Sequence, residues 1–232
     1  MKNFLLLLTM ICCWQIQTTA QNADATVYET IYRNATQQGD LTSAAFALHH
    51  LIATTQDSAR QQLYKESLVQ TYFNQQNYWA CERLASQLIA QAPVKLPILE
   101  MRATSRRQLG AAKEAISDYK LLLNNTNNAF HAYYLAQLQL GQQALDDGLV
   151  TLKKAEQLGT QEEDWVQLPV NQQQVQAVPL RAAIYHLKGI TLQSLNTKEN
   201  KTEALAAYEE AIRLFPDFYL AKQQKEALAD MD

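Results

Sequence analysis

The chain has 232 residues, of which 47% are hydrophobic and 19% are charged, and its formal net charge is −3. This composition is typical of a folded globular protein and excludes a disordered chain. Nucleic-acid-binding proteins usually carry a clustered basic surface. The net charge of this chain is slightly negative, so we expect no nucleic-acid partner.

The N-terminus has the features of an export signal. Lys2 precedes the apolar run Phe4–Trp14, and the small residues Thr18-Thr19-Ala20 form a cleavage site before Gln21. The apolar run is shorter than the ~20 residues that a membrane-spanning helix needs. We therefore predict a signal peptide at residues 1–20, with an uncleaved anchoring helix as the alternative.

The cysteines support the same setting. Cys12 and Cys13 lie in the signal, where Ile11 occupies a position that bacterial lipoproteins fill with a small residue, so we expect no lipid anchor. Cleavage leaves Cys81 as the one remaining cysteine, and the exported chain then has no internal disulfide. We expect a bacterial periplasmic or cell-envelope protein, with Cys81 buried as a small apolar residue.

Residues 180–216 are the clearest copy of a unit that recurs along the chain. Apolar residues three and four apart predict two helices, which Gly189 allows to approach closely and Pro216 ends. The pattern is carried by Tyr185, Gly189, Leu192, Ala204, Tyr208, Ala211 and Pro216. It resembles the tetratricopeptide repeat, a helix–turn–helix unit of about 34 residues. Two features depart from the family: Lys188 replaces a usual leucine, and the turn near Thr197–Lys201 is longer.

Four further copies are predicted between residues 21 and 158. Their helices are separated by breaks at Gly39-Asp40, Asn77-Tyr78, Gly110 and Asp146-Asp147. The fifth copy and a polar capping helix at Phe218–Met231 occupy residues 180–232. The resemblance implies an all-α, right-handed helical-repeat solenoid of about five units with a C-terminal capping helix.

Residues 159–179 interrupt the repeats. This segment contains two prolines, a glutamine cluster and Trp165, but no helical periodicity. About 20 residues without periodicity is long for a compact domain, so we expect an irregular insertion that is functional, disordered or an unrecognised helix. Its apolar residues lead us to predict that Trp165 packs against the fourth or fifth repeat, beside a mobile glutamine-rich part.

No pattern predicts catalysis. The sequence lacks a zinc-protease HExxH, a phosphate-binding GxxxxGK[ST] and a GxSxG nucleophile turn. None of the histidines has metal-ligand spacing, so surface or packing roles are expected for His49, His50, His131 and His186. We expect no catalytic residue, no metal and no cofactor, and a chain that is not an enzyme.

The resemblance implies a binding function instead. In the family, the first helices of the units line a concave groove that binds a protein or peptide. By position, the groove residues would be Glu29, Arg33, Glu66, Gln70, Phe73, Asn74, Glu100, Arg107, Gln108, Tyr133, Tyr134, Gln137 and His186. Their mixture of amide, aromatic and charged groups suits an extended peptide, and a solvated helix face is the alternative for each.

We therefore predict a non-enzymatic protein–protein interaction scaffold, or adaptor, in the cell envelope. Two alternatives are kept. The chain could be a structural subunit of an outer-membrane assembly or secretion complex. It could also be a glycan-binding accessory module, in which Tyr133, Tyr134 and Trp165 stack on sugar.

Overall fold

The computed structural model describes residues 24–91 and 93–231, which form two compact units divided between Leu109 and Gly110. The division lies in the turn that we predicted inside the third repeat, and each unit is described by itself. The predicted signal at residues 1–20, with Cys12 and Cys13, lies outside the described residues. None of the described helices is long and apolar enough to cross a membrane.

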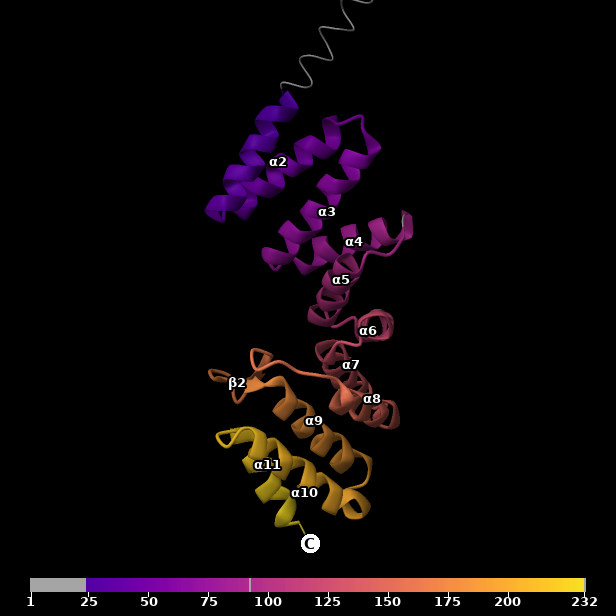
Figure 1. Ribbon diagram of the computed structural model, residues 1–232, viewed down its shortest axis with the longest axis vertical. Coiled ribbons are helices and arrows are strands. Elements are labelled where there is room, and N and C mark those ends of the chain that lie inside the picture. The colour runs from indigo at the N-terminus through magenta and orange to yellow at the C-terminus, as the bar shows by residue number, and fades with distance from the viewer. Residues whose placement is uncertain (1–23, 92, 232) are drawn as a thin grey trace, which may run out of the picture. The chain divides into compact units, whose positions relative to one another are not determined.

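The first unit consists of antiparallel helices that follow one another along the chain (Figure 1). They are the helical segment 24–38, α2 (Leu41–Thr54), α3 (Ser58–Asn74), α4 (Tyr78–Gln91) and α5 (Leu96–Gln108). Aspartates fix two of the helix starts: Asp40 accepts a hydrogen bond from the Ser43 backbone N–H, and Asp57 accepts from those of Ala59 and Arg60. Tyr28 and Tyr32 of segment 24–38 pack against the cluster that contains Leu48 and Leu51 of α2. Helix α3 packs against α4, so the first two predicted helix pairs are observed.

Two adjoining apolar clusters hold the first unit together. One contains the buried residues Ala45, Leu48, Leu51 and Leu68. The other contains Val69, Cys81, Ala85, Leu88, Ile98 and Met101. Cys81 is fully buried, and this burial raises the pKa of its thiol, which keeps the thiol protonated and unreactive. The prediction that Cys81 is a small core residue is confirmed.

The second unit contains the remaining helices and a pair of strands (Figure 1). Its elements are α6 (Ala112–Thr126), α7 (Ala129–Gly141), α8 (Leu145–Gln157), β1 (Trp165–Pro169), β2 (Val175–Pro179), α9 (Leu180–Leu195), α10 (Thr197–Leu214) and α11 (Tyr219–Ala229). Consecutive helices pack against each other, and α11 covers α10 as the predicted closing helix.

The turn between α9 and α10 is shorter than we predicted. The expected break at Thr197–Lys201 is helical, and Asn196 alone connects the two helices. The Asn196 side chain accepts hydrogen bonds from the backbone N–H groups of Lys198 and Glu199. Such an N-cap pairs donors that the first helical turn leaves unpaired, so the helix begins directly after Asn196.

Gly189 is the point of closest approach between α9 and α10. A Cβ atom at this position would lie 2.4 Å from Cε1 of Tyr208, whose ring is buried. The Tyr208 hydroxyl donates to Gln193 Oε1 at 3.0 Å, which holds the ring against α9. The prediction that Gly189 permits close packing of the fifth helix pair is confirmed.

Lys188, the unusual residue beside this contact, joins three helices. Its Nζ atom lies 2.9 Å from a carboxylate oxygen of Glu156 on α8 and 3.8 Å from one of Glu203 on α10. The Lys188 side chain is only 14% exposed. An ion pair that is largely shielded from water therefore occupies the position where the repeat family usually has leucine. The ion pair between Lys188 and Glu156 therefore links the fifth repeat to the fourth.

Residues 165–179 form an antiparallel β-hairpin, which the sequence analysis did not predict. Val166 pairs with Val178, and Leu168 pairs with Gln176. Val166, Leu168 and Val178 are buried, because alternate side chains of a strand point to one face. The helical alternative for this segment is wrong, and its glutamine-rich turn joins the two strands.

The hairpin is attached to the turn between α10 and α11. Gln176 donates through Nε2 to the Asp217 carbonyl at 2.6 Å and accepts through Oε1 from the Tyr219 N–H at 3.1 Å. The Trp165 ring lies edge-on to that of Phe215, with 5.9 Å between the centroids. Trp165 therefore contacts the fifth repeat, as predicted, although 44% of it stays exposed.

We predict that Gly189→Ala destabilises the second unit. The added methyl overlaps the Tyr208 ring, and overpacking of this kind costs ~1–3 kcal/mol, more than the ~1 kcal/mol that alanine gains over glycine in a helix. Gly141→Ala is the matched control, since no heavy atom lies within 4 Å of its added Cβ. Urea denaturation followed by circular dichroism should give a lower midpoint for Gly189→Ala only. Equal midpoints would contradict the close contact.

Candidate functional site

The predicted groove residues divide between the two units. In the first unit, Arg33, Gln70 and Asn74 are exposed, and the Gln70 amide donates to Asn74 Oδ1 at 2.9 Å. Gln108 at the end of α5 is exposed, and Arg107 is partly buried. The four exposed side chains are open to a partner in the described structure, and the role of all five residues in binding stays a prediction.

Three other groove positions of the first unit are used within the protein. Glu66 pairs with Lys95, whose Nζ atom lies 2.6 Å from its Oε1 atom. Glu29 accepts a short hydrogen bond from the Tyr64 hydroxyl, which joins segment 24–38 to α3. Burial, together with this carboxylate, raises the pKa of Tyr64 to about 12. Phe73 is partly buried against the Val69–Cys81 cluster.

Two predicted groove residues of the second unit are buried, so their assignment was wrong. Tyr133 is 3% exposed and His186 is 6% exposed, whereas Tyr134 is half-buried and Gln137 is exposed. A helix packed on several sides hides faces that a single-helix pattern assigns to solvent. The burial of Tyr133 also removes one of the three aromatic residues proposed to stack on sugar.

His186 lies in an aromatic environment. Its ring centroid is 4.7 Å from that of Phe218 and 6.0 Å from that of Tyr208. Burial lowers the pKa of His186 to about 4, and the nearby Gln224 side chain opposes this shift only in part. Among the described residues, His186 Nε2 has no close hydrogen-bond partner, so the neutral imidazole packs as part of the core.

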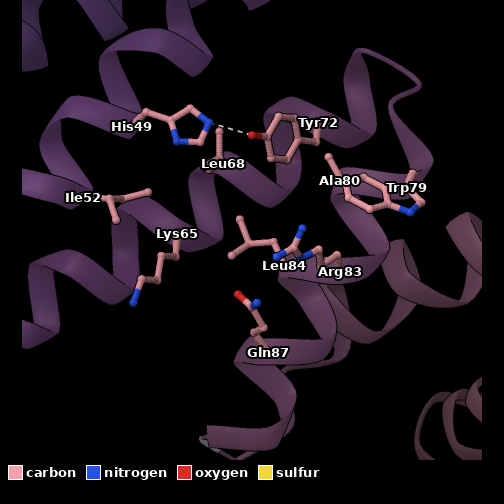
Figure 2. Close-up of a pocket in the computed structure, with 10 residues that line it drawn as sticks. All are labelled: His49, Ile52, Lys65, Leu68, Tyr72, Trp79, Ala80, Arg83, Leu84 and Gln87. Carbon is pink, nitrogen blue, oxygen red and sulfur yellow. Dashed lines mark hydrogen bonds between the residues drawn. The ribbon is translucent and has the colours of Figure 1, made fainter.

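A pocket in the first unit is a stronger candidate site. It has a volume of about 350 Å³ and lies between α2, α3 and α4 (Figure 2). We call it the α2–α4 pocket. Its lining residues are His49, Ile52, Lys65, Leu68, Tyr72, Trp79, Ala80, Arg83, Leu84 and Gln87.

The floor of the pocket is part of the protein core. Leu68 is a buried member of the Leu48–Leu51 cluster, and Ile52, Tyr72 and Leu84 pack against that cluster. The His49 imidazole and the Tyr72 hydroxyl form a hydrogen bond of 2.6 Å, drawn in Figure 2, which joins α2 to α3. Burial also raises the pKa of Tyr72, so its hydroxyl stays protonated near neutral pH. The pocket is therefore preformed by packed side chains.

An exposed tryptophan borders the pocket on α4. Trp79 is 63% exposed, and the Arg83 guanidinium carbon lies 5.4 Å from the centroid of its ring. The four-residue spacing places both side chains on one helix face, where they form a cation–π contact. This pair was not predicted from the sequence, although a tryptophan outside the Cys81–Ala85–Leu88 stripe of α4 indicates an exposed aromatic surface.

The pocket lies on a different face of α3 from the predicted groove. Lys65, Leu68 and Tyr72 line the pocket, while Glu66, Gln70 and Phe73 were assigned to the groove. Consecutive helix residues are rotated by about 100°, so these two triplets point in different directions. The described structure thus offers two separate surfaces on α3.

Comparisons with known proteins establish the fold. No protein-family model matches the chain, and no similar sequence is found among curated proteins. Solved structures do match. The crystal structure of YrrB, a TPR protein with an unusual peptide-binding site, has a TM-score of 0.68 and 15% identity, and the match covers 91% of this chain and 97% of YrrB.

The chain has the tetratricopeptide-repeat fold. A tetratricopeptide-repeat protein from Parabacteroides merdae gives a TM-score of 0.65 at 16% identity, covering 88% of this chain and 72% of the other. MamA gives 0.63 at 13% identity, covering 90% and 97%. The predicted all-α repeat architecture is therefore confirmed, with the β-hairpin as an addition to the tetratricopeptide-repeat pattern.

We predict that acid weakens the fold through His186. The unfolded histidine has a pKa near 6.5 and the folded one about 4, so the unfolded state binds more protons between these values. The contribution of neutral His186 to the free energy of unfolding is fully present above pH 6.5 and is lost as the pH falls. The loss is ~3 kcal/mol near pH 4, at ~1.36 kcal/mol per pKa unit. Urea denaturation at several pH values should show this loss, and His186→Asn should show a smaller slope. Parallel curves for parent and variant would contradict the neutral, buried imidazole.

Proposed function

We propose that this protein is an exported, non-enzymatic scaffold of the bacterial cell envelope that binds a short segment of a partner protein. The observation that carries the proposal is the α2–α4 pocket, with Trp79, Tyr72 and Arg83 beside an apolar floor. Tryptophan, tyrosine and arginine are the residues most enriched among those that dominate protein–protein binding energy.

The size of the pocket supports a peptide segment as the ligand. Its volume of about 350 Å³ falls near the lower end of the ~300–1,000 Å³ typical of ligand sites. One or two apolar side chains of a partner would fill it and exclude water from Leu68 and Leu84. The tetratricopeptide-repeat fold agrees with this proposal, since YrrB, which shares the fold, is described by its peptide-binding site.

The exposed residues of the predicted groove remain part of the proposal as additional contacts. Arg33, Gln70 and Asn74 are exposed on the first helices of their units, and Gln108 and Gln137 are exposed at equivalent sites further along. Gln70 and Asn74 lie on α3, which also lines the pocket, so a partner that extends around α3 would meet their amide groups. The alternative of a structural subunit in an outer-membrane or secretion complex predicts a permanently bound partner instead.

We predict that random peptides displayed on phage include binders to the purified full-length protein, and that these depend on Trp79. Trp79→Ala should weaken them about tenfold, because removal of an aromatic side chain that contacts the partner costs ~1–2 kcal/mol. Trp165→Ala is the matched control, since this exposed tryptophan belongs to the other unit. Titration of labelled peptides measures the affinities. No enriched peptide, or equal loss in both variants, would contradict the proposed function.

Export is tested separately. We predict cleavage after Ala20, so that the mature protein begins at Gln21. N-terminal sequencing and intact mass of the protein recovered from bacterial envelope fractions measure this. An uncleaved N-terminus, or added lipid mass on Cys12 or Cys13, would contradict the soluble exported form without affecting peptide binding.

A further inference from the structure

We infer that the α2–α4 pocket selects an acidic peptide segment, in which an apolar anchor residue is flanked by carboxylates. This inference rests on the proposed function and specifies the chemistry of its partner. It depends on three features of the pocket: the sign of its charges, the apolar floor between them and the partners of nearby acidic residues.

The charged side chains that line the pocket are both cationic. Lys65 comes from α3 and Arg83 from α4, and no carboxylate is present among the described lining residues. The chain as a whole has a net charge of −3, so this positive site is a local feature. Complementary charge across an interface steers association and selects partners, which favours an anionic ligand here.

Neighbouring carboxylates do not cancel this charge. Glu66 follows Lys65 in sequence but pairs with Lys95 at 2.6 Å, and Glu82 precedes Arg83 but pairs with Arg106 at 3.0 Å. Both carboxylates are thus engaged on faces of α3 and α4 away from the pocket. Lys65 and Arg83 keep donors available for a ligand.

The two cations have donors to spare. Within the described part of the chain, Lys65 Nζ donates one hydrogen bond, to Gln61 Oε1 at 3.0 Å, and an ammonium group has three donors. The Arg83 guanidinium is placed beside the Trp79 ring, a contact that leaves its edge N–H groups for a carboxylate. A peptide carboxylate would therefore gain charge-assisted hydrogen bonds, which are stronger than neutral ones.

The floor between the cations requires an apolar anchor. Ile52, Leu68 and Leu84 form this floor, and Figure 2 shows Leu84 between Lys65 and Arg83. An acidic ligand without an apolar side chain would leave this apolar floor in contact with water. Residues 1–23 of this chain contain no Asp or Glu, so the N-terminal segment lacks the required chemistry.

The test uses four fluorescein-labelled peptides of equal length with the purified full-length protein. One carries leucine between glutamates, the second replaces these glutamates by glutamines, the third by lysines, and the fourth replaces leucine by alanine. Fluorescence anisotropy at low and high salt measures each affinity. We expect the first peptide to bind tightest, about tenfold tighter than the glutamine peptide, and to weaken as salt screens the charges.

Variants locate the binding surface. Lys65→Gln and Arg83→Gln should each weaken the acidic peptide several-fold and leave the glutamine peptide unchanged. Arg60→Gln is the matched control, because it removes one exposed positive charge from α3 outside the pocket. It should change neither affinity.

Four results would overturn the inference. Preference for the glutamine or lysine peptide would reject acidic selectivity, while peptide binding itself stands. Loss of binding in Gln70→Ala, with the pocket variants unaffected, would place the peptide on the other face of α3. Self-association that blocks peptides and is lost in Trp79→Ala would make a second copy the occupant. Failure of these and all displayed peptides to bind would reject the proposed function as well.

Discussion

Close approach between consecutive helices is the constraint on which this structure depends. Each helix has an apolar stripe that it buries against its sequence neighbours, and the helices meet where one of them carries a very small residue. Gly189 is the clearest case, since even one methyl group there would overlap the Tyr208 ring. Cys81 and Ala85 have the same role in α4, where both are fully buried. The distance between helices in a pair is therefore set by a few small side chains.

The candidate site is built from the same packing. Leu68 is both a member of the first unit's core and a part of the pocket floor. The hydrogen bond between His49 and Tyr72 holds α2 against α3 at one edge of the pocket. A binding surface made from packed core residues is rigid before the ligand arrives, so little ordering entropy is lost on binding. The cationic residues Lys65 and Arg83 then add selectivity to a surface whose shape already exists.

Polar residues inside the fifth helix pair follow a related principle. Lys188 interrupts the apolar repeat pattern, but Glu156 and Glu203 supply the opposite charge within the same unit. His186 solves the problem differently, because its imidazole stays neutral between aromatic rings. Burial of an unpaired charge costs far more free energy than burial of a neutral polar group, so pairing and loss of charge both lower the cost. In both cases the side chains on neighbouring helices decide whether the buried polar residue is ion-paired or neutral.

The sequence by itself determined the helix pairs, the small residues at their contacts and the final capping helix. These features depend on apolar spacing and on glycine and proline, which are local properties of a helical chain. The hairpin at 165–179 was missed because its alternation is short and its outward face is uncharged and partly apolar, with Trp165, Val175 and Ala177 exposed. Only the tertiary structure decided that Tyr133 and His186 are buried and that Lys65, Tyr72 and Arg83 share a pocket. Those facts depend on which faces of neighbouring helices meet, and a periodic pattern within one helix does not contain that information.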